Sequence, residues 1–133
     1  MRVLIDTDVL IDVALKREEF FRDSNRVLEW VETGGGQAAV AWHSVSNLAY
    51  MMTDARDFIR DLLQFVEVAP SGASEVLTAL ELPMKDLEDA MQAAAARSFN
   101  AAWLITRNVG DYKKSPVPGI SPTDFLEELA PTQ

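Results

Sequence analysis

Acidic side chains gather at three places in the sequence, each next to an apolar segment. Asp6 directly follows the apolar run at positions 3–5, and Asp8 lies two residues later. Asp89 lies early in an alanine-rich segment, and Asp111 lies in a polar stretch after another apolar run. Carboxylates held close together repel one another and raise at least one pKa unless a cation is present. A carboxylate-bound divalent metal can turn water into a nucleophile and hold a phosphodiester oxygen. The pattern therefore indicates metal-assisted chemistry on phosphate esters.

The composition limits which metal could serve. The chain has no cysteine, which excludes a disulfide framework, a thiolate nucleophile and a cysteine zinc site. His43 is the single histidine, so a histidine cluster is excluded as well. Any metal must be bound by oxygen, which indicates Mg²⁺ or Mn²⁺.

Charge and length narrow the class of protein. Twelve basic against 21 acidic residues give a net charge of −9, which argues against broad electrostatic binding of nucleic acid but leaves room for a local basic rim. The length of 133 residues predicts a single domain, 1–133, with a core of its own. We see no signal peptide and no apolar run long enough to span a membrane, so we expect a cytoplasmic protein without a membrane partner.

The apolar patterns predict strands that alternate with helices. We expect strands at 3–5, 37–42, 65–70, 102–106 and 116–121. We expect helices at 9–16, 23–32, 44–52, 54–65, 72–82, 86–100 and 122–129, with Asp8, Ser44 and Asp86 as N-caps. This alternation predicts βαβ units and a parallel sheet covered on both faces.

The topology decides whether the acids meet. Ligands of open parallel sheets bind outside the carboxyl ends of the strands. If the first and fourth strands are neighbours, Asp6 and Asp8 converge with Asp89 and with the turn that holds Asn108 and Asp111.

Each acid also has a structural interpretation. Asp8 can be explained as a helix N-cap, and Asp12 as a solvated residue one helical turn later. Asp89 can be explained as an acid that the helix dipole stabilises in the first turn. Asp6 is the hardest to explain structurally, because a carboxylate that ends a buried strand needs donors. Taken together on three converging segments, the acids favour a functional site.

Four segments resemble one known family in order along most of the chain. VLIDTDVLIDVAL, DLEDAMQAAAA, LITRNVGDY and ISPTDFLEEL look like a PIN domain of the kind found as the ribonuclease toxin of VapBC toxin–antitoxin pairs. The resemblance implies a three-layer α/β/α fold around a central, mostly parallel five-stranded sheet. It also implies a Mg²⁺- or Mn²⁺-dependent endoribonuclease, an RNA substrate, a homodimer and a cognate antitoxin.

Carried over by position, the family's acidic quartet is only partly present. Asp6 matches the first acid and Asp89 the third, with Asp8 as a polar neighbour that could bind metal. Asn108 takes the usual place of the fourth acid, so Asp111 is the nearest carboxylate, and Thr106 would support the site through its hydroxyl. The glutamate expected as second acid is replaced by Asn47, in SVSNLAYMM.

The remaining expectations concern the substrate and the alternatives. Arg107 and Lys113 could contact an RNA phosphate. Because Asn47 brings no charge, the alternative to a nuclease is a catalytically weakened PIN-fold module that binds RNA or protein. A further alternative reads DTDVL as the Asp-x-Asp motif of haloacid-dehalogenase-like phosphatases, with Asp6 as nucleophile.

Overall fold

The structure, a computed structural model, describes residues 1–130, so the last three residues of the predicted 1–133 domain lie outside it. Its centre is a five-stranded sheet with the strand order β3-β2-β1-β4-β5, in which every pair is parallel. The strands are β1 (Arg2–Ile5), β2 (Gln37–Val40), β3 (Glu67–Val68), β4 (Trp103–Ile105) and β5 (Gly119–Ile120). The prediction that the first and fourth strands are neighbours is therefore confirmed.

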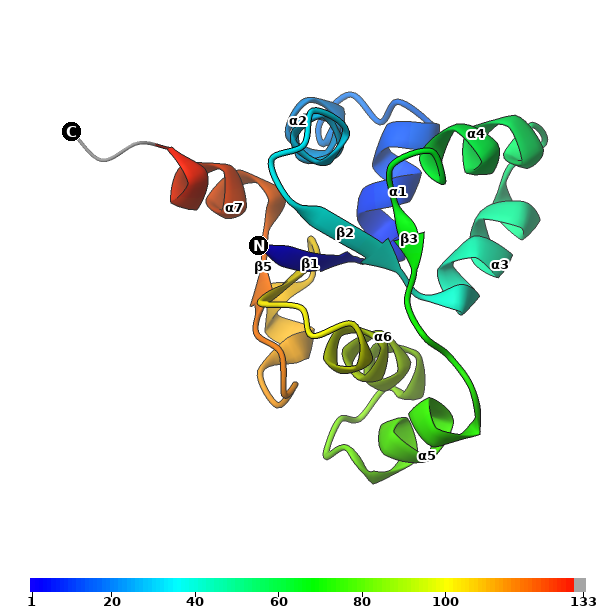
Figure 1. The fold of residues 1–133 in the computed structure, drawn as a ribbon, viewed down its shortest axis with the longest axis vertical. Coiled ribbons are helices and arrows are strands. Elements are labelled where there is room, and N and C mark those ends of the chain that lie inside the picture. Colours follow the sequence, from blue (N-terminus) through cyan, green and yellow to red (C-terminus); the bar gives the residue numbers. More distant parts are fainter. Residues whose placement is uncertain (131–133) are drawn as a thin grey trace.

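Helices cover both faces of the sheet. They are α1 (Thr7–Ala14), α2 (Phe21–Glu32), α3 (Trp42–Met51), α4 (Ala55–Leu62), α5 (Ala73–Glu81), α6 (Leu87–Ser98) and α7 (Pro122–Leu129), and a 3₁₀ helix, η1, spans Val109–Tyr112. In Figure 1, α1, α2 and α4 lie on one side of the strands and α5 and α6 on the other. This arrangement confirms the predicted three-layer α/β/α fold. Within residues 1–130, no helix has the length and apolar character needed to cross a membrane.

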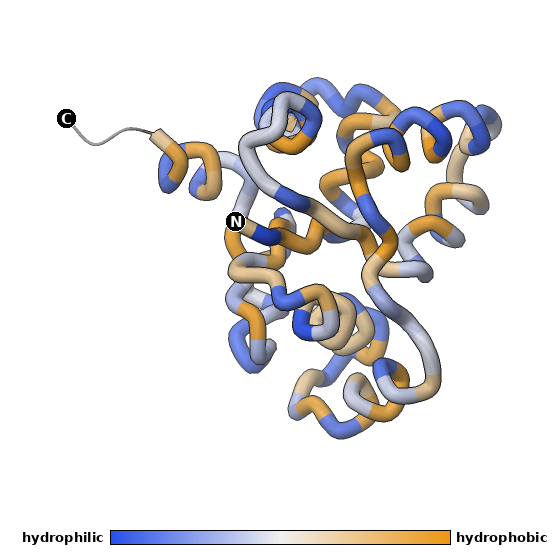
Figure 2. The backbone as a smooth tube through the Cα atoms, viewed as in Figure 1, coloured by the Kyte–Doolittle hydropathy of each residue, from blue (hydrophilic) through white to orange (hydrophobic). Residues whose placement is uncertain are grey.

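The core is divided by the sheet into two halves. Val3 and Ile5 point to one face and pack in a cluster with Phe125 of α7, whereas Leu4 points to the other and packs with Ala96 of α6. The apolar strands run through the middle of the molecule in Figure 2. Four consecutive alanines of α6, 93–96, are all buried, on the sides that face the sheet and α5. Small side chains permit close packing, which brings the first turn of α6 to the carboxyl edge of the sheet.

Two predicted caps are wrong, and both helices start earlier than expected. Asp6, not Asp8, caps α1, because the chain turns into the helix immediately after β1. Ser44 is not the cap of α3 either, since α3 begins at Trp42 and Ser44 is completely buried within it. The predicted cap Asp86 of α6 does accept a backbone N–H group. The helix α7 starts at Pro122 as predicted, and Ser121, which was expected to end a strand, is its cap.

Four strands are shorter than predicted, β4 by one residue at each end. The second ends at Val40 because the next residues enter α3. β3 and β5 are the two edge strands, and each pairs with its one neighbour through only two residues. Apolar residues beyond these pairs pack in the core without joining the ladder, so the pattern of hydrophobicity overstated the strand lengths.

Candidate active site

The register of β1 against β4 places Asp6 at the carboxyl edge of the sheet. Ile5 pairs with Ile105, so the residues that follow, Asp6 and Thr106, leave the sheet side by side. Asp6 Oδ1 accepts a hydrogen bond from the Thr7 backbone N–H (2.7 Å), and Asp6 Oδ2 accepts one from the Thr106 hydroxyl (2.9 Å). Asp6 is only 8% exposed. One oxygen thus caps α1, and the other faces the ends of the neighbouring elements.

A tyrosine hydroxyl joins two of the acids. The Tyr112 hydroxyl lies 3.0 Å from Asp6 Oδ2 and 3.2 Å from Asp89 Oδ1. Tyr112 is buried at the end of η1, and the Asp86 cap of α6 orients the first turn by accepting the Asp89 backbone N–H (2.9 Å). A phenol carries one donor hydrogen, so it can donate to one carboxylate at a time. The carboxylates of Asp6 and Asp89 are therefore held close together with fewer hydrogen-bond donors than two ionised carboxylates need.

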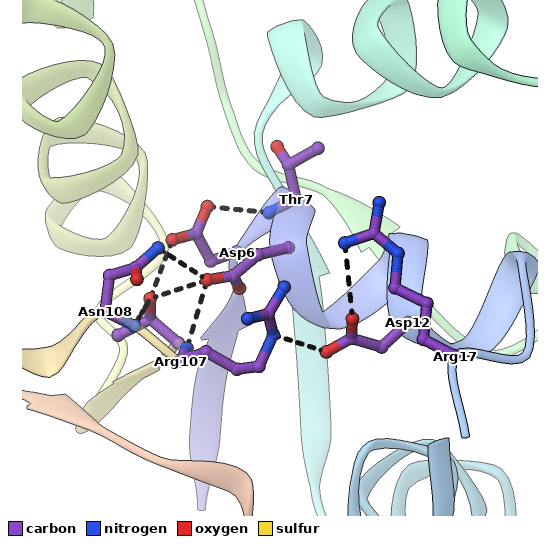
Figure 3. A network of polar contacts seen from close by, with 8 residues as sticks. Asp6, Thr7, Asp12, Arg17, Arg107 and Asn108 are labelled. Atoms are coloured by element: carbon purple, nitrogen blue, oxygen red, sulfur yellow. Dashed lines mark hydrogen bonds and ion pairs between the residues drawn. The ribbon is translucent and has the colours of Figure 1, made fainter. Parts of the chain in front are cut away.

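Asp8 is tied to the turn after β4. Its Oδ2 accepts from the Arg107 backbone N–H (3.1 Å) and the Asn108 side-chain amide (3.0 Å), and the Thr106 hydroxyl lies 3.3 Å away. Figure 3 shows this network beside Asp6, with Asn108 and Arg107 approaching from the β4 side. The other oxygen, Asp8 Oδ1, is buried without any hydrogen-bond partner in the structure. A buried carboxylate oxygen without a hydrogen-bond donor can bind a cation, or accept a hydrogen bond from a water molecule bound to a cation.

Burial, and to a smaller extent repulsion by neighbouring carboxylates, raises the pKa of all three acids. Burial is the main cause of the raised pKa of Asp6. Burial, then the Asp6 carboxylate, raise the pKa of Asp8 to about 7. Burial, then the Asp86 carboxylate, raise the pKa of Asp89 to about 6, and burial beside both acids also raises the pKa of the Tyr112 phenol. The site thus carries more negative charge than its own donors neutralise.

These acids open into a hollow of about 400 Å³. Its lining comes from α1, α3, α6 and the turn after β4, and consists of Asp6, Thr7, Asp8, Ile11, Arg17, Asn47, Met51, Glu88, Asp89 and Asn108. Across it, the side-chain amide of Asn47 donates to Glu88 Oε1 (3.2 Å). Among these lining residues Arg17 is the cationic one, at the rim. The predicted residues Asp6, Asp8, Asp89, Asn47 and Asn108 are thus brought together.

The donor set fits a hard divalent cation. In the described part of the chain, no three acidic or histidine side chains stand ready-arranged as a metal-binding group. Mg²⁺, however, is commonly held by one or two carboxylates with water completing its shell. Asp6 and Asp89 supply two carboxylates on either side of one hydroxyl, and Asp8 supplies the orphaned oxygen. All the ligands are oxygen, as the composition requires.

A buried polar network fixes the helices beneath the hollow. The side-chain amide of Gln92 donates to the Ser44 hydroxyl (2.9 Å) and the Thr7 hydroxyl (3.1 Å), and these hydroxyls lie 2.7 Å apart. All three residues are at least 90% buried. One residue each from α6, α3 and α1 takes part, so the network sets the distances between the helices that carry Asp89, Asn47 and Asp8.

Other predicted residues lie outside the hollow. Asp111 and Lys113 are exposed on and after η1 and do not line it, so their proposed roles stay predictions. Arg107 faces away from it: its Nε donates to Asp12 Oδ2 (2.6 Å), and its guanidinium lies 4.0 Å from the centroid of the Phe20 ring. Asp12 is completely buried, so the expectation of a solvated Asp12 is wrong.

Sequence reasoning missed Tyr112 and Glu88. The signal for Tyr112 was present, because an aromatic residue after a polar turn buries its ring and needs a partner for its hydroxyl. Glu88 carried no comparable signal, since an acid in the first turn of a helix is common for electrostatic reasons alone.

The fold and the site define a class: a parallel α/β sandwich with clustered acids at the carboxyl edge of its sheet. Residues 2–110 match the family profile described as PIN domain, so the chain belongs to the PIN domain family. The resemblance seen in the sequence is thereby confirmed. The alternative of a haloacid-dehalogenase-like phosphatase is wrong, because the matched region contains both the DTDVL stretch and Asp89.

Solved structures share this fold at low sequence identity. A structure of VapBC2 from Rickettsia felis, bound to a DNA fragment from the promoter, has a TM-score of 0.70 and 17% identity, and covers 91% of this chain and 98% of that one. A toxin–antitoxin complex from Klebsiella pneumoniae has a TM-score of 0.65 and 22% identity, covering 90% and 97%. FitAcB from Neisseria gonorrhoeae has a TM-score of 0.62 and 14% identity, covering 91% and 98%. None of the curated protein sequences compared gives a significant match.

Proposed function

We propose that the protein is a Mg²⁺- or Mn²⁺-dependent endoribonuclease that hydrolyses RNA phosphodiester bonds. The observation that carries the proposal is the meeting of Asp6 and Asp89 around the Tyr112 hydroxyl, at the edge of the sheet where such folds bind ligands. The raised pKa values of the acids support it, because a cation is what relieves their repulsion. Membership of the PIN domain family supports a nuclease in particular.

The chain's own residues have distinct tasks in this proposal. Asp6 and Asp89 would hold the metal, with Asp8 beside them. A bound divalent ion would activate water for attack and would stabilise the negative charge that develops on the phosphate. Thr106 and Tyr112 fix the orientation of Asp6 by donating to its Oδ2. Arg17, at the rim and 42% exposed in its side chain, is placed to bind an RNA phosphate.

Purified protein tests the proposal directly. We expect it to cleave a mixture of single-stranded and structured RNA when Mn²⁺ is added, and to stop when EDTA removes the metal, as seen on a denaturing gel. Addition of excess Mn²⁺ after EDTA should restore cleavage, which excludes damage by the chelator. Intact RNA after incubation with folded, metal-saturated protein would contradict the enzymatic proposal.

One observation favours the second candidate, a catalytically weakened binding module. Asn47 and Asn108 place neutral amides in the hollow where the family resemblance implies acids. This candidate predicts that RNA or a protein partner binds with unchanged affinity after Asp6→Asn, and that Mn²⁺ produces no cleavage. Binding measured by fluorescence anisotropy, alongside the cleavage assay, separates the two candidates.

We further propose that the protein is the cytoplasmic toxin of a VapBC-type pair. Its support is the fold shared with solved toxin–antitoxin complexes, and a cognate antitoxin would be its protein partner.

We also propose a homodimer, through the outer surfaces of α3 and α5. Trp42 and Tyr50 of α3 are 63% and 93% exposed, and Leu77 and Leu80 of α5 are 61% and 58% exposed. An apolar pocket of about 390 Å³ lies between the N-terminal ends of these helices, and Figure 2 shows hydrophobic stretches of both at the periphery. The apolar side of α2 is buried in the core and is not available for association.

Sedimentation tests the dimer. We expect a particle of twice the 14.7 kDa chain mass, and a monomer after Leu77→Glu, because a buried charge without a partner opposes association. Glu81→Gln, at the end of the same helix, is the control that should leave the dimer unchanged. A monomeric wild type at high protein concentration would contradict the dimer.

A further inference from the structure

The hollow has an acid on α6 facing the amide on α3. Asn47 is the polar residue that α3 contributes to the hollow, at the position where the family resemblance implies a glutamate. Its nitrogen donates to Glu88 Oε1 (3.2 Å), across 41 residues of sequence. Only the nitrogen of the amide can donate to a carboxylate, so this contact also fixes the orientation of the Asn47 side chain.

We infer that Glu88, oriented by Asn47, supplies the negative charge that α3 lacks for binding the divalent metal. Glu88 lines the same hollow as Asp6 and Asp89, and it comes from the helix turn that already positions Asp89. The carboxylate of this pair lies on α6 and the amide that holds it lies on α3. This inference rests on the proposed function, since it concerns the same metal.

An ordinary role for Glu88 makes a different prediction. Acids in the first turn of a helix are stabilised by its dipole, and Asp86, Glu88 and Asp89 all lie at the start of α6. If Glu88 had only this role, removing its charge would affect metal binding no more than removing the charge of Asp86, which caps α6 and does not line the hollow.

The test is calorimetric titration of the full chain with Mn²⁺ alone. Glu88→Gln keeps an oxygen that accepts from Asn47 but removes the charge, and we expect the Mn²⁺ dissociation constant to rise by about tenfold or more. Asp86→Asn removes a nearby charge, retains a good helix cap, and should change the constant by less than about threefold. Circular dichroism and melting temperature without metal establish that both variants are folded.

A charge exchange makes the test specific. In Asn47→Glu/Glu88→Gln the carboxylate and the amide trade helices, and the hydrogen bond between them can persist with its direction reversed. We expect this double variant to bind Mn²⁺ within about threefold of wild type, because the net charge in the hollow is restored.

The outcomes separate the two proposals. A wild type that binds no Mn²⁺ overturns both the metal-dependent function and the role of Glu88. If wild type and Glu88→Gln bind Mn²⁺ with equal affinity, the proposed function is retained but the role of Glu88 is overturned. Equal losses in Glu88→Gln and Asp86→Asn also overturn it.

Discussion

Asp6→Asn is expected to abolish Mn²⁺-dependent RNA cleavage, by about a thousandfold or more, while the metal-free protein stays at least as stable as wild type. Activity is lost because the amide cannot contribute charge to the metal. Stability is kept because asparagine caps a helix as well as aspartate, so the Thr7 N–H retains an acceptor. The introduced amide nitrogen can donate to the Tyr112 hydroxyl, which leaves that hydroxyl free to donate to Asp89.

The pH dependence of stability provides a second measurement on the same variant. Burial raises the pKa of Asp6 above its ordinary 3.8 in the fold, so the folded protein binds its proton more tightly than the unfolded chain does. The favourable contribution of Asp6 is therefore complete below pH 3.8 and is lost as the pH rises through the raised value. We expect the melting temperature of metal-free Asp6→Asn, relative to wild type, to increase as the pH rises above 3.8.

Asp57→Asn is the matched control. It removes one carboxylate from an exposed position on α4, where Asp57 pairs with Arg60 at the surface. We expect cleavage and stability close to wild type, because such surface pairs contribute little. Cleavage by Asp6→Asn within about tenfold of wild type would show that Asp6 is not the acid that holds the metal.

The position of Asp6 was predictable because local signals determine it. A buried strand at 3–5, another at 102–106 and an alternation of helices leave few topologies, and parallel neighbours align their carboxyl ends. Local signals also placed Asp89 in the first turn of an alanine-rich helix, whereas the support of the site by Thr106 was expected from the family resemblance. The end of the first strand was thus predictable, although the helix after it was predicted to start two residues too late.

The partners of the polar groups were not predictable because they are distant in the chain. Tyr112 meets Asp6 across 106 residues, Glu88 meets Asn47 across 41, and Arg107 meets Asp12 across 95. A hydrophobic period of 3.6 or 2 residues indicates which side of a helix or strand faces the core. It does not indicate which polar side chain from a distant part of the sequence forms a hydrogen bond with that element. Asp12 is an example: the sequence pattern assigned it to solvent, but its carboxylate is fully buried and paired with Arg107.

Arg107→Met is expected to destabilise the protein by about 3 kcal/mol at pH 8, because it leaves the Asp12 carboxylate buried without its main partner. Arg107 Nε lies 2.6 Å from Asp12 Oδ2, and Arg17 is farther away, 3.8 Å from Oδ1. Methionine retains an apolar contact with Phe20 in place of the guanidinium stacked there. Urea unfolding measures the loss. A variant as stable as wild type but unable to bind RNA would restore the phosphate-binding role that the sequence suggested for Arg107.

Removing the charge of Asp12 as well should restore most of the stability that Arg107→Met loses. In Asp12→Asn/Arg107→Met no ionised group remains to be desolvated, so we expect more than half of the lost stability to return, as a double-mutant cycle would show. A change of pH acts in the same direction on the single variant. Burial already raises the pKa of Asp12 even beside Arg107, and loss of Arg107 raises it further. The carboxyl is then protonated in the fold at acidic pH and needs no cation, so the cost of Arg107→Met should be smaller at pH 5 than at pH 8. If the loss of stability in Arg107→Met does not depend on pH and is not reduced by Asp12→Asn, then Arg107 stabilises the protein by packing against Phe20 instead.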